Sequence, residues 1–212
     1  MDMPTDPATR AGPGRTDAIS GSAADLRSAA DLRDLDRRIN AFSAIFDDDD
    51  RPPAGGADGP LGGLSFAVKE VLDQEGRAAS WGVDLLAGRI ASATAPVVRR
   101  IAEAGAVAVG TTRSTVLAIA GDSGTRNPWD VSRSPGGSSA GSAAAVAMGA
   151  VDFALGTQTV GSIVRPAAYC GVVGFKPGFG MVPTEGGMVL SEELDHVGVL
   201  ARDVATARAV FS

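Results

Sequence analysis

The chain has 212 residues, of which 44% are hydrophobic and 21% charged, with a formal net charge of −6. This length allows one sizeable core, and the composition is typical of soluble globular proteins. Because no Lys/Arg-rich run is present, we expect no nucleic-acid partner and no binding to an anionic membrane surface. No stretch approaches the roughly 18 apolar residues of a membrane span.

The chain contains one cysteine, Cys170, so no intrachain disulfide can form. The first 18 residues are polar and lack the apolar core of a signal peptide. These two features predict a cytoplasmic location.

The N-terminal part divides into two predicted regions. Residues 1–22 are dominated by Pro, Gly, Ser and Asp, which predicts a disordered tail. Residues 23–58 are expected to form a helical segment followed by a loop. The apolar residues of 23–46 recur at three- and four-residue steps and indicate an amphipathic helix or a helical pair, and residues 47–63 have the charge, Pro and Gly of a solvated loop.

The next segment indicates an α/β fold. Residues 64–71 alternate as in a strand, which places Lys69 on the same face as Ser65 and Ala67. A helix is expected near residues 95–103 and a short buried strand at 106–112.

Two Gly/Ser-containing loops follow. The first, residues 134–139, leads into an Ala-rich helix whose serines can cap its first turn. A strand at 151–157 then precedes a second glycine-containing turn at 160–162. Glycine allows such turns to approach another group closely, and their free backbone N–H groups can stabilise an oxyanion.

A serine in these loops needs a base to become a nucleophile. A Ser-His-Asp triad would have to use His196, the only histidine, and its nearest acid is its neighbour Asp195. The other candidate base is a lysine that burial keeps uncharged. Lys69 and Lys176 are the only lysines, and Lys69 lies on a strand among small residues.

Two sequence runs resemble the amidase signature family. GGSSAGSAAAV and ALGTQTVGSIVRPAAYCGVVGFKP are similar to its signature, and FAVKEVLD is similar to the strand that carries its lysine. The resemblance extends over residues 59–210. It implies an α/β/α sandwich with a mixed sheet, of which residues 59–212 form the N-terminal half to two-thirds of a core that is incomplete at its C-terminus.

The resemblance also implies a Ser-Ser-Lys triad. Ser162 corresponds to the nucleophile that accepts the acyl group. Ser138 corresponds to the bridging serine, which the family holds through a cis peptide bond, and Lys69 corresponds to the general base.

The backbone N–H groups of Thr159, Val160, Gly161 and Ser162 correspond to the family's oxyanion hole. The implied reaction is hydrolysis of a non-peptide C–N amide bond in a small carboxamide or urea-like substrate through an acyl-enzyme. No cofactor and no metal are expected. The sequence does not fix the oligomeric state, and a homodimer is one state left open.

Other motif interpretations fit less well. Residues 137–141 satisfy G-x-S-x-G, but the residues before them are loop-like, whereas a nucleophile elbow follows a strand. A P-loop would need GK[ST]. Cys170 lies in an apolar setting and is expected to be a core residue. Asp195 and His196 are expected to be structural.

Three departures from the family pattern bear on function. Gln158 stands where many members have Asp, and Val160 stands where Gly or Ala is usual. An acid and an aromatic residue are also often found near Val116 and Leu117. Gln158 resembles the branches of the family that do not act with tRNA, and Val160 motivates one alternative function, an inactive fragment that acts as a binding module. The amidase subunit of a tRNA-dependent amidotransferase is a second alternative.

Overall fold

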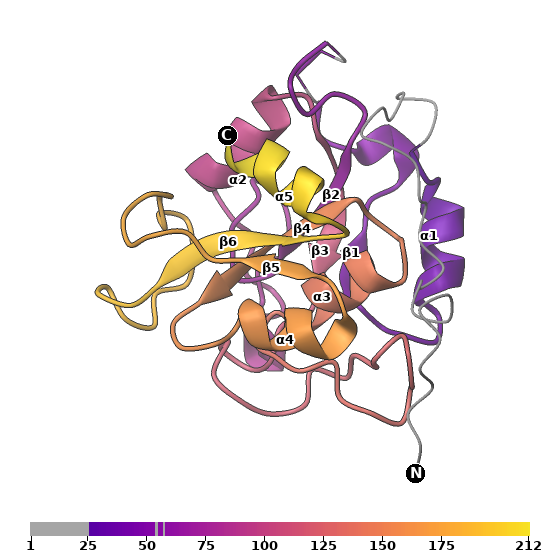
Figure 1. The fold of residues 1–212 in the computed structure, drawn as a ribbon, viewed down its shortest axis with the longest axis vertical. Coiled ribbons are helices and arrows are strands. Elements are labelled where there is room, and N and C mark those ends of the chain that lie inside the picture. Colours follow the sequence, from indigo (N-terminus) through magenta and orange to yellow (C-terminus); the bar gives the residue numbers. More distant parts are fainter. Residues whose placement is uncertain (1–25, 54, 57) are drawn as a thin grey trace.

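The structure, a computed structural model, describes residues 26–53, 55–56 and 58–212. The tail predicted for residues 1–22 lies outside the described residues. Six strands form one mixed sheet in the order β1-β3-β2-β4-β6-β5. Helices lie on both faces of this sheet (Figure 1). The α/β class predicted from the sequence is therefore confirmed.

The strands differ in direction. β2 runs parallel to its two neighbours, β3 and β4, whereas β1, β6 and β5 are each added antiparallel. The bounds are β1 Phe42–Ile45, β2 Ser65–Lys69, β3 Val107–Thr112, β4 Phe153–Gln158, β5 Val173–Phe175 and β6 His196–Ala201.

The helices cover the sheet in two layers. α1, α3 and α4 contribute to one hydrophobic cluster, and α2 and α5 contribute to the other. The bounds are α1 Ala29–Asp36, α2 Pro96–Glu103, α3 Ala140–Ala147, α4 Val164–Cys170 and α5 Val204–Phe211. None of these helices in the described part of the chain has the length and apolar character that a membrane crossing requires.

The central strand β2 is buried along its whole length. Phe66 and Val68 belong to the cluster under α2 and α5, and Ala67 belongs to the cluster under α3. Phe66 stacks on Phe153 of β4 with ring centroids 5.3 Å apart. Because side chains alternate along a strand, Lys69 projects to the α3 side with Ala67, as predicted.

The helix expected over residues 23–46 is shorter than predicted. α1 covers only 29–36, and 42–45 form the edge strand β1. Asn40 has a left-handed φ of 57°, which reverses the chain after the helix. The carboxylate of Asp36 then accepts hydrogen bonds from the N–H groups of Ala41 and Phe42. The apolar residues spaced at helical steps over 23–46 therefore lie partly in a helix and partly in a strand.

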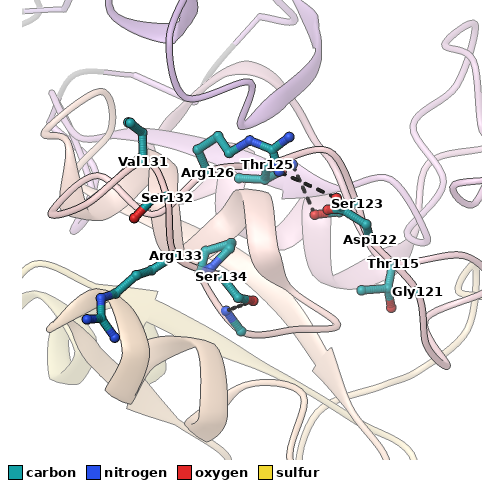
Figure 2. Close-up of a pocket in the computed structure, with 12 residues that line it drawn as sticks. Thr115, Gly121, Asp122, Ser123, Thr125, Arg126, Val131, Ser132, Arg133 and Ser134 are labelled. Atoms are coloured by element: carbon teal, nitrogen blue, oxygen red, sulfur yellow. Dashed lines mark hydrogen bonds and ion pairs between the residues drawn. The ribbon is translucent and has the colours of Figure 1, made fainter.

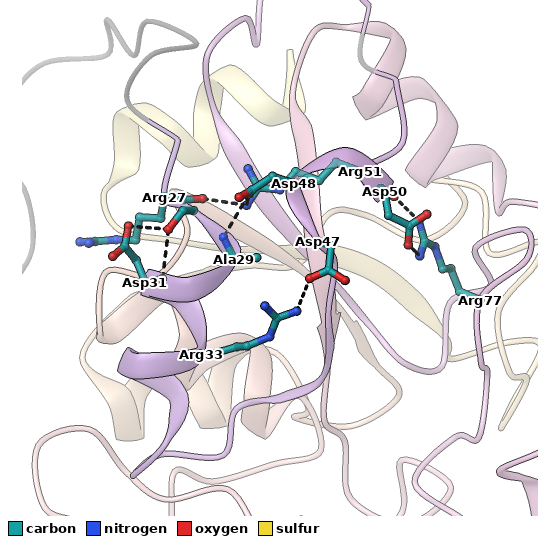
Figure 3. Close-up of polar contacts among 10 residues, drawn as sticks. Arg27, Ala29, Asp31, Arg33, Asp47, Asp48, Asp50, Arg51 and Arg77 are labelled. Carbon is teal, nitrogen blue, oxygen red and sulfur yellow. Dashed lines mark hydrogen bonds and ion pairs between the residues drawn. The ribbon is translucent and has the colours of Figure 1, made fainter.

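The acidic stretch at residues 47–50 is exposed, as predicted, but it is also anchored by arginines. Asp48–Asp50 form a short 3₁₀ helix, and the Asp48 carboxylate accepts a 3.1 Å hydrogen bond from the N–H of Ala29 in α1. Three ion pairs hold the stretch, as Figure 3 shows: Arg33–Asp47, Arg51–Asp48 and Arg77–Asp50. Exposed pairs contribute little free energy singly, so their main effect is to orient this segment beside α1.

The start of α3 lies directly against backbone. A Cβ on Gly141 would lie 2.1 Å from the carbonyl oxygen of Ala41 and 2.6 Å from the nitrogen of Arg113. Only glycine permits this approach. The loop that precedes α3 is thereby brought to the ends of the central strands.

Candidate active site

Lys69 ends β2 and its side chain is fully buried. Its Nζ lies 2.8 Å from Ser138 Oγ and 2.8 Å from Thr157 Oγ1. Burial lowers the pKa of Lys69 to about 7, against the opposing effect of the negative charges of Glu70 and Asp195. A large share of the lysine is therefore an uncharged amine at neutral pH, the form that can accept a proton.

The serines of the first loop do not cap α3. Ser139 is the N-cap residue but makes no side-chain cap hydrogen bond. Its hydroxyl instead donates to the carbonyl of Thr157 at 3.3 Å, and Ser142, inside α3, donates to the carbonyl of Leu155 at 2.9 Å. Ser139 thus faces β4 and Ser138 faces Lys69, and the Gly137–Ser138 peptide bond is cis.

The second serine loop connects β4 to α4 and is tied to the first. Ser139 N donates to the carbonyl of Ser162 at 3.2 Å, and Arg165 Nε donates to the carbonyl of Gly137 at 2.8 Å. Ser162 is partly exposed, while Ser138 is fully buried. The structure therefore brings Lys69 and Ser138 into contact and joins the loop of Ser138 to that of Ser162.

Residues 159–162 form an open turn. Within the described residues, their backbone N–H groups donate no hydrogen bond. Val160 does not have a positive φ, and 87% of its surface is exposed. Valine therefore causes no backbone strain at this position, and its N–H remains available as a donor.

The side chain of Gln158 braces this turn. Its carbonyl oxygen accepts hydrogen bonds from the N–H groups of Ile163 (2.8 Å) and Val164 (3.0 Å), and its amide donates to the carbonyl of Val160 (3.2 Å). An aspartate could accept the first two bonds but could not donate the third. The sequence marked Gln158 as a departure from the family pattern, and the structure shows which contacts it makes.

Asp195 holds the same turn from another side. Its carboxylate accepts from Thr159 Oγ1 and from the N–H groups of Leu190 and Ser191. Nδ1 of His196 contacts the carbonyl of Leu194 at 2.7 Å. Asp195 thus orients Thr159 and not the imidazole, so this pair does not form the histidine triad considered as an alternative.

Glu70 is a buried residue that sequence reasoning missed. Its carboxylate accepts hydrogen bonds from Ser114 N (2.6 Å), Ser114 Oγ (3.1 Å) and Ser80 Oγ (3.3 Å). It therefore joins two loops beside Lys69. The nearby residues Trp81 and Leu117 have left-handed φ values of 54° and 49°, and Leu117 N donates to the carbonyl of Trp81.

Two adjoining cavities lie next to the first serine loop. Figure 2 shows the larger one, of about 610 Å³, which Asp122, Arg126 and Arg133 line. The smaller one, of about 320 Å³, reaches Gly137 and Arg165. The residues common to both linings are Thr115, Gly121, Ser134 and Gly136.

Neither an activated thiol nor a metal cluster is found in the described part of the chain. Cys170 is buried, and burial raises the pKa of its thiol to about 12. The described residues contain no group of three or more His, Cys, Asp or Glu side chains that could hold a metal.

The amidase family model matches residues 31–212. The chain belongs to the amidase family. It is 40% identical over 209 residues to a glutamyl-tRNA(Gln) amidotransferase subunit from Anaeromyxobacter sp. (strain K), covering 92% of this chain and 42% of that protein. It is also 44% identical over 181 residues to amidase 1 of Arabidopsis thaliana, covering 81% of this chain and 43% of that protein.

Solved structures of relatives share the fold. The crystal structure of a glutamyl-tRNA(Gln) amidotransferase subunit from Thermotoga maritima has a TM-score of 0.80 at 33% identity, covering 86% of this chain and 41% of its own. Peptide amidase from Stenotrophomonas maltophilia gives 0.75 at 34% identity, covering 89% and 45%. The chain therefore spans less than half the length of these relatives.

Proposed function

We propose that this chain carries the reactive centre of an amidase that hydrolyses the C–N bond of a small carboxamide or urea-like substrate. The observation that carries the proposal is the 2.8 Å contact between the buried Nζ of Lys69 and Ser138 Oγ. A lysine with a pKa of about 7 can take a proton at physiological pH.

Protons move through two hydroxyls in this proposal. Neutral Lys69 takes the proton of Ser138 while Ser138 takes that of Ser162, whose oxygen attacks the amide carbon. The tetrahedral intermediate expels the nitrogen, which receives a proton back along the same path. The acyl group remains on Ser162 until water, activated by the same relay, releases the acid.

The turn at residues 159–162 acts as the oxyanion hole in this reaction. Its unpaired N–H groups are available to the developing negative charge on the substrate oxygen. Gln158 and Asp195 fix the turn from two sides, so little reorganisation is needed during the reaction.

The smaller cavity lies beside the loop of the proposed bridging serine and could receive a polar group of the substrate. Its volume is about 320 Å³, and Arg165 lines it three residues after the proposed nucleophile. Arg165 forms no ion pair within the described residues. Its terminal nitrogens therefore favour amides that carry an anionic or strongly polar group beside the reactive carbonyl.

The test is ammonia release from short carboxamides by the 212-residue chain and by its Ser162→Ala variant. We expect turnover by the parent chain and loss of turnover in the variant. Equal ammonia release from both would refute Ser162 as nucleophile. A parent chain that folds but neither turns over nor accumulates an acyl adduct would support the inactive binding module.

A second candidate is the amidase subunit of a tRNA-dependent amidotransferase, favoured by the 40% identity to a subunit of such an enzyme. It predicts stable partner subunits and transfer of ammonia to an acceptor. Affinity purification from the native cell distinguishes the two candidate functions. Co-purified partner subunits support the amidotransferase, and a chain found alone or bound to its own copies supports the stand-alone amidase. A cytoplasmic location and a homodimer are part of the stand-alone proposal.

A further inference from the structure

Thr157 contacts the proposed base, Lys69, and the loop that carries the proposed bridging serine. Its Oγ1 lies 2.8 Å from Lys69 Nζ, and its carbonyl oxygen lies 3.3 Å from Ser139 Oγ in the first serine loop. It lies one residue before Gln158, the last residue of β4. One residue of a central strand thus contacts both the lysine and the first serine loop, and it lies two residues before the proposed oxyanion turn.

The hydrogen-bonding capacity of an amine explains why this contact matters. A neutral amine has two N–H groups and one lone pair, whereas an ammonium has three N–H groups and no lone pair. Within the described residues, the hydrogen-bond partners of Lys69 Nζ are Ser138 and Thr157. If Thr157 accepts an N–H, the lone pair is free to face Ser138.

We propose that Thr157 is a positioning residue of this site, whose hydroxyl oxygen accepts an N–H of Lys69 and so turns the lone pair of the amine toward Ser138. This inference rests on the proposed function, because it assumes that Lys69 is the base. In the protonated state the same oxygen accepts one N–H of the ammonium, and Ser138 accepts another.

The charged groups that act on Lys69 are Glu70, its neighbour in the chain, and Asp195, which precedes β6. The negative charges of Glu70 and Asp195 favour the protonated form of Lys69, and the Thr157 oxygen favours the same form by accepting a hydrogen bond from it. Replacing Thr157 with valine keeps the shape and β-branching of the side chain but removes the acceptor. The ammonium then loses one charge-assisted hydrogen bond, so the lysine should lose its proton at a lower pH.

The test is an NMR pH titration of chains labelled with ¹³C-lysine. The sequence contains only Lys69 and Lys176, so two side-chain signals are expected, and Lys176→Arg assigns them. We expect Thr157→Val to move the titration midpoint of Lys69 down by about one pH unit, and Thr157→Ser to keep the parent midpoint. Thr157→Ala removes the same oxygen and serves if the valine variant does not fold.

An unchanged midpoint in Thr157→Val and Thr157→Ala, or the same shift in Thr157→Ser, would overturn the inference. The titration needs no substrate, so its result is separate from the fate of the proposed function. If the parent chain hydrolyses amides, the acid limb of its kcat/KM profile should move with the NMR midpoint. A structural defect would lower the rate without moving that limb.

Discussion

Arg165 Nε donates a 2.8 Å hydrogen bond to the carbonyl of Gly137, which joins the loop of the proposed nucleophile to that of the proposed bridging serine. The same side chain lines the smaller cavity. Arg165 therefore contributes both a contact between the two loops and a positive charge in the cavity, and substitutions can separate these two contributions.

Replacing Arg165 with alanine should reduce hydrolysis of both neutral and anionic amides by about tenfold through the lost loop contact, with a further rise in KM for anionic amides. Arg165→Lys retains the charge but not the planar fork, so it should recover part of the KM effect. Steady-state kinetics on a matched pair of amides measures this. Equal KM changes for the two substrates would show that Arg165 does not contact the anionic group.

Lys69 should make stability depend on pH in an identifiable window. Its folded pKa of about 7 lies below the unfolded value of 10.5, so between these values the unfolded chain holds the extra proton. The contribution of this residue to the free energy of unfolding therefore rises with pH, by about 1.4 kcal/mol per unit.

Urea denaturation of the parent chain and Lys69→Met tests this. Relative to the variant, the parent should gain about 2.5 kcal/mol between about pH 7.5 and about pH 9.5. Lys176→Met is the matched control, and its free energy of unfolding should depend on pH as that of the parent does. A parallel pH dependence of the parent and Lys69→Met would mean that the buried amine is charged in the folded state.

The elements that carry the site could be predicted because their signals are local. Strand alternation placed Lys69 on the face of Ala67, and the two Gly/Ser loops marked the positions of Ser138 and Ser162. In the structure, the amine of Lys69 contacts the hydroxyl of Ser138, although these residues lie 69 positions apart. The catalytic roles of the three residues stay predictions until they are measured.

Thr157 and Glu70 could not be predicted, since their contacts depend on tertiary structure. Thr157 meets Lys69 because β4 pairs in parallel with β2, and this register is set by the sheet as a whole. Glu70 gains its role from loops that fold back near residues 80 and 114. The strand β1 was missed because a few apolar residues near a helix end satisfy both periodicities.

Removing the brace at Gln158 should impair catalysis more than folding. Gln158→Leu loses three hydrogen bonds to the turn and helix start, and we expect kcat to fall about 10²-fold with a Tm loss of a few degrees. Gln158→Glu can still accept two of the hydrogen bonds, so its kcat should lie between those of the parent and Gln158→Leu. Kinetics with calorimetry measures both effects, and unchanged kcat in Gln158→Leu would remove the turn from the mechanism.

Glycine at position 160 should not stabilise the chain. Because Val160 has a negative φ, Val160→Gly relieves no strain and should lower the free energy of unfolding by about 0.5–1 kcal/mol. Val189→Gly, at another exposed apolar position, is the matched control. A rise in stability for Val160→Gly alone, measured by urea denaturation, would indicate that valine strains the turn.

The central claim is that neutral Lys69 activates Ser162 through Ser138. The most direct measurement is the rate at which a fluorophosphonate labels Ser162, mapped by peptide mass spectrometry across pH. The rate should rise with pH through a midpoint near 7 and fall about 10²- to 10⁴-fold in Lys69→Met and Ser138→Ala. Labelling at Ser162 that is independent of pH, or equally fast in Lys69→Met, would contradict it.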